Sequence, residues 1–229
     1  MKRVILDKNI SVYSIELLKS SGFDIIKTFA LPEIDNSTST HPDMQFLKIA
    51  DKKALVAESA YAYYVDMLPD FEIISVSGIK EKYPDDCLLN SVLFKKLYIS
   101  TSKQHAVISE YIDADPIIVN QGYTKCSTCV LNENSILTGD DGIYKKCTEF
   151  GLKAYKLPDN EISLCGYNNG FWGGCTGLLN DSQMFFNGNI ELLSCFDKLQ
   201  YILYKEKIEP IYHKHTPLTD NGSIISIDF

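Results

Sequence analysis

Two stretches of this chain, 122–143 and 170–190, have the same pattern at a constant separation. They read GYTKCSTCVLNENSILTGDDGI and GFWGGCTGLLNDSQMFFNGNI. A similarity at a fixed period indicates a repeated structural unit, and this constrains the fold more than any other feature of the sequence. At an offset of 48 positions the coinciding residues are Gly122 with Gly170, Thr128 with Thr176, Leu131 with Leu179 and Asn132 with Asn180.

The unit that begins at Lys125 predicts a hairpin, a helix and a third strand. Alternation of apolar and polar residues indicates the strands, and polar turn residues separate the first two. Gly151 indicates the end of the helix, because glycine is common just after a helix. The expected elements are strands over 126–131 and 135–139, a helix over 142–150 and a strand over 152–157.

The same order of elements occurs about five times. Further units begin at Asp43, Asn90 and Gly173, and the last of these predicts a long helix over 189–208 that Asn189 caps. A fifth unit is divided between the ends of the chain. Its expected elements are a strand over 223–228 paired to residues 3–7, a helix over 10–22 and a strand over 23–29.

Five hairpin–helix–strand units around a pseudo-fivefold axis predict an α/β (α+β) fold, a five-bladed α/β propeller of ββαβ repeats known as the pentein fold. The split unit predicts a single domain over residues 1–229, closed by pairing of the N- and C-terminal strands. Closure removes the exposed strand edges that an open ring would carry. The alternative is an α+β domain in which the similarity of the modules is coincidental.

Four segments carry a resemblance to a known family: HPDMQFLKIADKKALVAES, QGYTKCSTCVLNENSILTGDDGI, GFWGGCTG and PLTDNGSII. They resemble an uncharacterised bacterial family described as having the guanidine-modifying-enzyme fold. The repeat pattern of the whole chain is more distantly similar to arginine deiminase, dimethylarginine dimethylaminohydrolase and the amidinotransferases. A ribosome anti-association factor, which is not an enzyme, has the same fold.

The resemblance implies a particular catalytic set, and this sequence departs from it. The enzymes use a cysteine thiolate against the guanidinium carbon, a histidine for proton transfer and carboxylates that hold the cation. In HPDMQF, Asp43 matches the first acidic position. The second acidic position falls on residues 125–128, which contain no carboxylate, no histidine lies near Cys175, and no cysteine follows Cys195. The standard mechanism is therefore expected to be absent in its usual placement.

A rewired site remains a hypothesis, because reactive side chains come from equivalent strand starts. Cys126 would be the nucleophile, with Lys125 lowering its pKa, and His41 would be the acid–base group. Asp43 and Asp220 would hold a cation. The remaining candidate ligand-binding residues are Gln45, Lys125, Cys129, Trp172 and Cys175.

Three functions follow from these alternatives. The first is binding of a small cationic ligand, guanidine- or amine-like, in the axial channel without the standard catalytic set. The second is a rewired amidinohydrolase or amidinotransferase that uses Cys126, His41 and Asp43. The third is a non-enzymatic ring that binds a protein partner.

Charge and composition limit the partners. The net charge of −8 argues against nucleic acid, whose binding rests on Lys and Arg. No apolar run approaches the roughly 18 residues of a membrane span, and the start MKRVILDKN is too short for a signal-peptide core. The seven cysteines without an export signal predict reduced thiols and a cytoplasmic location. A small molecule is the expected partner, and the oligomeric state is left open.

Several motifs have simpler interpretations than a cofactor or metal site, and neither is expected. Cys126 and Cys129 have CxxC spacing, but no second pair completes a zinc site. Asp140 and Asp141 are expected to cap a helix. His213 and His215 are expected to be solvated. Trp172 is either a core residue or a pocket wall, and the nearby glycines Gly170, Gly173, Gly174 and Gly177 are expected to permit a tight turn and close backbone approach.

Overall fold

The strands of this protein form five separate three-stranded sheets. The computed structural model describes residues 2–94 and 96–228. In every sheet the middle strand pairs antiparallel with one neighbour and parallel with the other, as the hairpin–helix–strand unit requires. The strands are β1 (Lys2–Leu6), β2 (Phe23–Lys27), β3 (Phe46–Ala50), β4 (Lys53–Ala57), β5 (Glu72–Val76), β6 (Val92–Leu93), β7 (Leu97–Ser100), β8 (Asp115–Ile118), β9 (Thr128–Asn132), β10 (Ser135–Thr138), β11 (Lys153–Lys156), β12 (Thr176–Asn180), β13 (Gln183–Phe186), β14 (Glu209–Tyr212) and β15 (Ile225–Ser226).

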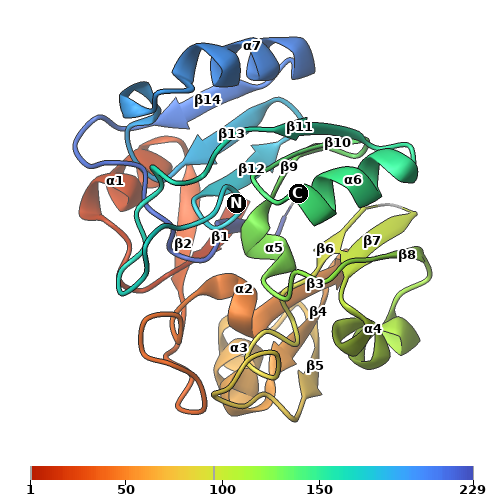
Figure 1. Cartoon of the computed structure of the whole chain (residues 1–229). Coiled ribbons are helices and arrows are strands. Elements are labelled where there is room, and N and C mark those ends of the chain that lie inside the picture. Colours follow the sequence, from red (N-terminus) through yellow and green to blue (C-terminus); the bar gives the residue numbers. More distant parts are fainter. Residues whose placement is uncertain (1, 95, 229) are drawn as a thin grey trace.

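The five sheets surround a common centre, and the longer helices lie outside them (Figure 1). The inner strands are β15, β3, β6, β9 and β12, each the antiparallel partner of a middle strand. This arrangement is the predicted α/β propeller. The outer helices are α1 (Val12–Ser20), α3 (Tyr61–Met67), α4 (Ser102–Ile108), α6 (Asp141–Glu149) and α7 (Phe196–Glu206), and short 3-10 turns cover Glu58–Ala60, Ser109–Tyr111 and Ile190–Leu192.

The repeat at an offset of 48 has a structural cause in two hairpins. Asn132 ends β9 and its side-chain oxygen accepts the N–H of Asn134 at 2.9 Å. Asn180 ends β12 and accepts the N–H of Ser182 at 3.0 Å in the same way. Asparagine is favoured here because its side chain closes a turn on its own backbone. The coinciding residues therefore mark equivalent turns of two blades.

Three of the expected units differ locally from the structure. In the units that begin at Asp43 and Lys125, a short helix precedes the first strand, α2 (Pro42–Gln45) or α5 (Thr124–Ser127), so that Cys126, expected in a strand over 126–131, is helical. Both helices lie near the centre of the ring (Figure 1). The helix expected over 189–208 is divided, because Asn189 caps only the 3-10 turn and the chain is extended at Leu193 before α7 begins.

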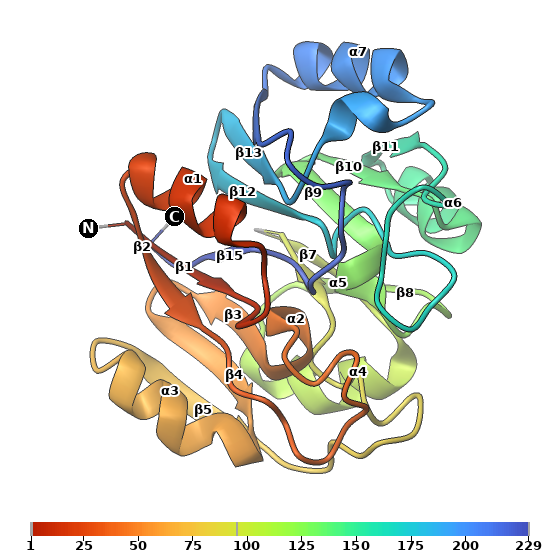
Figure 2. The ribbon, with the colours of Figure 1, turned by 90° about the vertical axis from the view of Figure 1, so that its left-hand side faces the viewer.

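Strands from the two ends of the chain complete one blade. β15 pairs antiparallel with β1, with Val4 opposite Ser226, although β15 is shorter than the expected strand over 223–228. Figure 2 shows β15 alongside β1 and next to α1. The Arg3 guanidinium donates to Asp228 at 2.7 Å and to Asp70 at 2.7 Å, so an ion-pair network holds the terminal strand against its neighbours.

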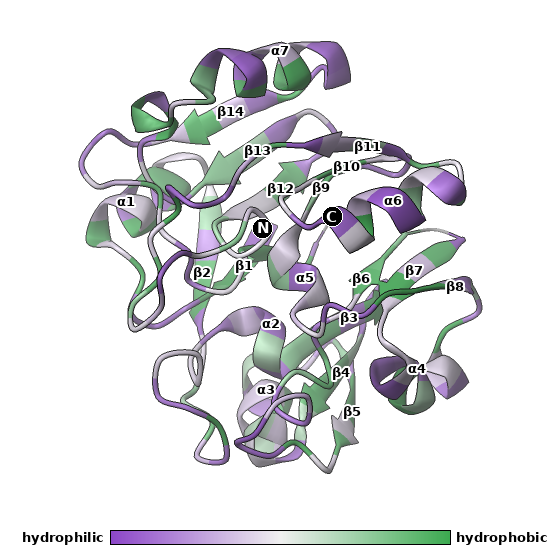
Figure 3. Cartoon of the chain, viewed as in Figure 1, coloured by the Kyte–Doolittle hydropathy of each residue, from purple (hydrophilic) through white to green (hydrophobic). Residues whose placement is uncertain are grey.

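Hydrophobic residues are concentrated in the strands, as the colouring of Figure 3 shows for the sheets. The outer helices also bury apolar residues, such as Ile143 of α6 and Leu199 of α7. Four buried clusters fill the spaces between sheets and helices. All seven cysteines have free thiols. Of the helices in the described parts of the chain, none has the length and apolar character to cross a membrane.

Candidate functional site

The inner strands all begin at the same end of the ring, and the segments that precede them meet there. α2 leads into β3, and its start is set by Pro42 at the first helical position, where proline costs no hydrogen bond. α5 leads into β9. The segment 219–224 leads into β15, with Gly222 and Ser223 at positive φ of 74° and 69°. Residues far apart in the sequence thus lie together on the ring axis.

Asp43 and Cys126 are in direct contact at this point. The Cys126 thiol donates to Asp43 Oδ2 at 3.1 Å, and the Ser223 hydroxyl donates to the same oxygen at 2.6 Å. The other carboxylate oxygen, Asp43 Oδ1, is buried without a hydrogen-bond partner among residues 2–94 and 96–228. These three side chains, together with Asn90, form what we call the partition.

Asn90 joins the two short helices of the partition. Its side-chain oxygen accepts the backbone N–H groups of Lys125 at 2.7 Å and Cys126 at 3.1 Å. Its amide donates to the Asp43 carbonyl and to Cys126 Sγ, both at 3.2 Å. A fully buried asparagine with this many partners fixes the relative position of Asp43 and Cys126.

We therefore expect Asn90→Ala to lower the free energy of unfolding by about 2–4 kcal/mol, because the buried N–H of Cys126 loses its side-chain acceptor and a cavity is left. Chemical denaturation would measure the change. Asn168→Ala, in an exposed loop, is the matched control and is expected to change stability by less than about 0.5 kcal/mol. A loss below about 1 kcal/mol for Asn90→Ala would show that Asn90 does not hold the partition together.

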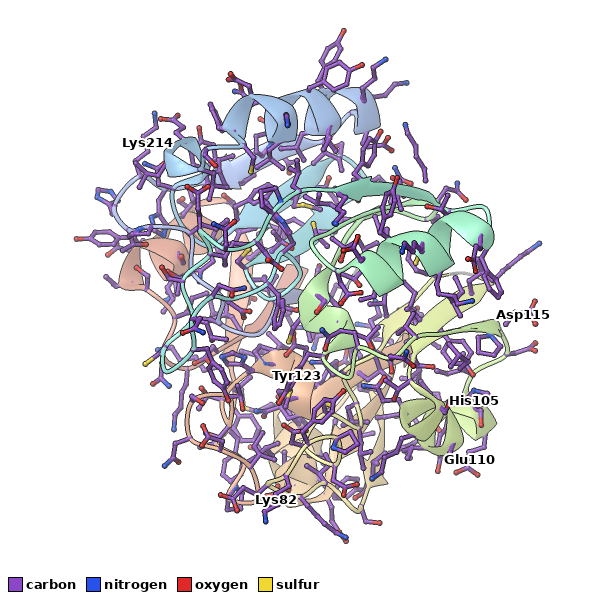
Figure 4. All side chains as sticks on the ribbon, viewed as in Figure 1. Lys82, His105, Glu110, Asp115, Tyr123 and Lys214 are labelled. Carbon is purple, nitrogen blue, oxygen red and sulfur yellow. The ribbon has the colours of Figure 1, made fainter. Side chains whose placement is uncertain are left out.

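On one side of the partition lies a cavity of about 110 Å³, which we call the mouth cavity. Its surface is mainly apolar, and His41, Cys126 and Asp220 are among its lining residues. The other lining residues are Thr38, Met44, Tyr123, Leu164, Tyr167, Asn169 and Phe171. Tyr123 lies near the middle of the molecule, at the beginning of α5 (Figure 4), and its hydroxyl donates to Asp86 at 2.6 Å. The segment 164–169, in which Tyr167 is half exposed, covers the cavity.

Asp220 is held in the mouth cavity by backbone groups. Its two oxygens accept the N–H groups of Gly222 and Phe171, each at 2.9 Å. Burial raises the pKa of Asp220 to about 6; the nearby His41 opposes this rise and Asp43 adds to it. A side chain on Gly174 would lie 2.1 Å from Asp220 Oδ1, and one on Gly170 would lie 2.4 Å from its Cβ. The expected close approach at these glycines therefore makes room for a carboxylate.

The environment of Cys126 is the opposite of what the rewired site requires. Burial, with the charges of Asp43 and Asp220, raises the pKa of the Cys126 thiol well above its usual value. The expected lowering by Lys125 is wrong, because the Lys125 ammonium instead donates to Ser223 Oγ at 3.3 Å and lines a second cavity beyond the partition. His41 lies beside Asp7, with Nε2 at 4.0 Å from Asp7 Oδ2.

The other candidate residues lie away from the mouth cavity. The Gln45 amide donates to the Phe29 carbonyl at 2.8 Å and its oxygen accepts from Tyr64 at 3.0 Å, so its polar atoms serve the fold. Cys129, Trp172 and Cys175 belong to a buried cluster, in which Trp172 is fully buried. The structure thus brings together His41, Asp43, Cys126 and Asp220 out of the predicted set.

Sequence reasoning missed Asn90 and Ser223 as site residues. Asn90 stands at the start of the third unit, the position that Asp43 and Lys125 occupy in their own units, so the repeat alignment carried the signal. Ser223 follows Asp220 in the segment where the related enzymes have their cysteine, and only its positive φ and its contact with Asp43 reveal its place in the partition.

The histidines near the C-terminus and Asp140 have defined partners in the structure. Among the described residues, no group of three or more His, Cys, Asp and Glu side chains is placed to hold a metal ion. His213 is buried, contrary to the expected solvated position, and its Nε2 lies 2.8 Å from Ser14 Oγ. His215 stacks on Tyr13 with ring centroids 4.1 Å apart.

Asp140 caps α6 as expected, since it accepts the N–H of Ile143 at 2.8 Å.

Solved structures with the same fold are guanidine-modifying enzymes. The N-terminal domain of ArgZ, a cyanobacterial arginine dihydrolase, superposes with a TM-score of 0.62 at 11% identity, over 99% of this chain and 98% of that one. SxtG, an amidinotransferase from Microseira wollei, has a TM-score of 0.58 at 10% identity, over 93% and 88% of the two chains. Agmatine deiminase from C. jejuni has a TM-score of 0.57 at 9% identity, over 98% and 92%.

These likenesses establish the fold, since identities of this size carry no information about the reaction. No curated protein has a significantly similar sequence. The sequence model of one family does match, over residues 5–225, and that family is described as a family of unknown function, DUF6873. The chain belongs to this family and has the pentein fold of the guanidine-modifying enzymes.

Proposed function

We propose that this protein binds a small cation of the guanidine or amine class in the mouth cavity, without the standard catalytic set of its structural relatives. The observation that carries the proposal is the buried carboxylate of Asp220, which lines this cavity and has no ion-pair partner among the described residues. A buried carboxylate without a counter-charge is costly, so a bound cation would stabilise it.

The surroundings of Asp220 favour the same class of ligand. The carboxylate of Asp43 lies behind Cys126, and both carboxylates raise the pKa of that thiol, so the local charge is negative. Tyr123 and Phe171 contribute aromatic walls, which attract cations through their ring faces. A cavity of about 110 Å³ is well below the roughly 300–1,000 Å³ that drug-sized ligands occupy, so it suits a head group.

The test is a panel of guanidines and amines, with arginine, agmatine and methylarginines, screened by their effect on the melting temperature. A ligand that binds only the native state raises its stability by mass action. Asp220→Asn is expected to weaken binding by at least about tenfold, because a charge-assisted contact is lost. Asp24→Asn removes one exposed carboxylate and is the matched control, expected to bind as the unmodified protein does.

Binding is also expected to depend on pH through Asp220. With a pKa of about 6, this carboxyl is mostly protonated at pH 5 and mostly ionised at pH 7. Affinity for a cation should therefore rise about tenfold from pH 5 to pH 7, because the ionised fraction of this carboxyl rises about tenfold. Calorimetric titration at both pH values measures this, and Asp220→Asn should flatten the profile. A panel without any binder, or a profile that Asp220→Asn leaves unchanged, would contradict the cation site.

Ionisation of Asp220 should also affect stability without ligand. Its pKa is higher in the folded protein than the ordinary 3.8, so the folded state holds the proton more tightly. The resulting stabilisation is complete below about pH 4 and is lost as the pH rises through about 6. A bound cation restores stability at neutral pH, because it takes the place of the lost proton.

A second candidate function is covalent chemistry at Cys126. The observation that favours it is that Cys126 and His41 line the same cavity, with Asp43 in hydrogen-bond contact with the thiol. The thiol would have to lose its proton before it could attack a guanidinium carbon. A cation bound against Asp220 would favour the Cys126 thiolate. The binding function and the covalent function therefore both begin with a bound guanidine, and they differ in whether the guanidine is then consumed. Citrulline-type product in the same panel would indicate the enzyme, and failure of all compounds would favour a protein-binding ring.

A further inference from the structure

A second cavity lies on the ring axis, beyond the partition from the mouth cavity, and we call it the channel cavity. It has a volume of about 230 Å³, and residues of all five inner strands or of the segments before them line it. Its walls are mainly apolar, with Phe46, Val92, Val130, Leu178 and Ile224 among them. The volume far exceeds the roughly 10–15 Å³ that one water molecule needs, and apolar walls offer water no hydrogen-bond partners. The cavity therefore suits a molecule with an apolar part.

Two buried polar side chains of the channel cavity lack hydrogen-bond partners. Asp43 of the partition lines the cavity, and so does Ser91, which follows Asn90 of the partition in the chain. Asp43 Oδ1 and Ser91 Oγ are buried and unpaired in the described parts of the chain, and both side chains are 1% exposed. Buried polar atoms are nearly always paired in folded proteins, so these two indicate a partner outside the chain. Since a carboxylate oxygen only accepts, that partner must bring an N–H or O–H donor to Asp43.

The Lys125 ammonium, on the same cavity, needs an acceptor instead. It has three N–H donors and makes one hydrogen bond to a described residue, that to Ser223 Oγ at 3.3 Å. The Ser223 hydroxyl lies 2.6 Å from Asp43 Oδ2, so it separates the ammonium from the carboxylate. Neither Asp43 nor Lys125 takes part in an ion pair with another described residue. Two opposite charges thus lie close together on the cavity without direct contact.

The third charged residue on the channel cavity, Lys48, has counter-charges of its own. Burial lowers the pKa of Lys48, and the charges of Asp51 and Asp228 oppose this lowering. The charges left for a ligand are therefore one negative charge, on Asp43, and one positive charge, on Lys125. A ligand that matches both carries one charge of each sign and has no net charge.

We infer that the channel cavity binds an aliphatic α-amino acid as its zwitterion. The ammonium of the ligand would donate to Asp43 Oδ1, and its carboxylate would accept from the Lys125 ammonium and the Ser91 hydroxyl. The ammonium and carboxylate of an α-amino acid are joined through one carbon atom, which suits two protein charges that a single hydroxyl separates. The aliphatic side chain would lie against the inner strands. The cavity is below the roughly 300 Å³ at which sites for drug-sized ligands begin, so it suits one small amino acid.

The channel cavity is accessible at the end away from the partition. Lys48, Ile225 and Ser226 line it there and are half-buried. An amino acid can therefore enter without passing through the mouth cavity. The site is separate from the proposed cation site, because the partition divides the two cavities and their ligands meet different charged groups.

Calorimetric titration of the full chain with L-valine, L-isoleucine and L-leucine tests the inference, and we expect saturable binding at one site. Leucine has two matched analogues: 4-methylpentanoate lacks its ammonium, and 3-methylbutan-1-amine lacks its carboxylate. Each analogue is expected to bind at least about tenfold more weakly than leucine, because either Asp43 or Lys125 then has no ligand group of opposite charge.

Lys125→Gln tests which residue meets the carboxylate. It should weaken leucine binding by at least about tenfold, so that leucine loses its advantage over 3-methylbutan-1-amine, which has no carboxylate to lose. Lys19→Gln removes an exposed lysine of α1 and is the matched charge control, with unchanged affinity expected.

A second variant keeps the test decisive if Lys125→Gln disturbs the partition. Val130→Phe fills the channel cavity from β9 without any change of charge, and it should abolish leucine binding in a protein that still melts cooperatively. The inference is overturned if none of the three amino acids binds the unmodified protein, or if either analogue binds as tightly as leucine. Leucine binding that neither variant weakens would place the ligand elsewhere and overturn it equally. A failed guanidine screen would leave this result unaffected, so the two proposals fall separately.

Discussion

A chain that lacks residues 222–229 is expected not to fold. The deletion removes β15, the inner strand of one blade, and leaves the edge of β1 unpaired. It also removes Ile224 and Ile227, which are 3% and 0% exposed, and their burial alone contributes roughly 3–6 kcal/mol. This loss is comparable with the about 5–15 kcal/mol that stabilises a whole domain.

The deletion has two further costs that add to the same effect. Ser223 no longer donates to Asp43, so a second oxygen of this buried carboxylate loses a partner. Arg3 loses its contacts with Asp228, which include a donation from the guanidinium at 2.7 Å. Both ends of the chain are therefore expected to be needed for one cooperative fold, as a single closed domain requires.

Circular dichroism and thermal melting of the truncated chain measure the outcome. A shorter deletion, of residues 228–229 alone, is the matched control, because it removes the Asp228 ion pairs but keeps β15 and both isoleucines. It should melt cooperatively at a temperature only slightly below that of the full chain, since partly exposed ion pairs contribute little. A chain without residues 222–229 that melts cooperatively and remains monomeric would show that ring closure is not required.

Slow alkylation of Cys126 is the second large effect that the structure predicts. The thiolate is the reactive form, and burial with two nearby carboxylates raises the pKa of Cys126 well above its usual value. Cys126 is also 4% exposed, whereas Cys165 is the exposed cysteine of the chain. Near neutral pH, iodoacetamide should therefore modify Cys165 at least about a hundredfold faster than Cys126.

Mass spectrometry of peptides after timed labelling gives both rates in the same sample. The control is the protein unfolded in urea, in which the two cysteines should react at similar rates because their environments become alike. Cys126 labelling at or above the rate of Cys165 in the folded protein would reverse the conclusion and support the nucleophile of the rewired enzyme. If a guanidine bound in the mouth cavity accelerates Cys126 labelling, the cation stabilises the thiolate and the second candidate function gains support.

The fold of this protein could be predicted from its sequence because local patterns repeat. Each blade needs a hairpin, a helix and a strand, and the asparagines Asn132 and Asn180 mark equivalent turns that close on their own backbone. The joining of the chain ends in one blade could be inferred in the same way, from half a unit at each end. The short helices α2 and α5 could not, because a four-residue helix leaves almost no period in the sequence.

The candidate site was predicted only in part, since its properties depend on contacts between distant segments. The repeat placed Asp43 and Cys126 at equivalent blade positions, and the structure shows them 3.1 Å apart although 83 residues separate them. Gln45 and Cys129 start from similar positions but their side chains serve the fold, because the direction of a side chain is set by the local backbone and not by its place in the repeat.

The sequence by itself therefore determined the blades, their number and the division of one blade between the two ends of the chain, because strand alternation and turn chemistry are local and recur at each unit. Only the tertiary structure decided the protonation and pairing of the side chains on the ring axis. Burial raises the pKa of Cys126 despite the adjacent Lys125, whose ammonium lies on the other side of the partition. Burial and the distances between charges arise only when the chain is folded, and these two quantities control whether a thiol, a carboxylate or an ammonium is reactive, paired or free to bind a ligand.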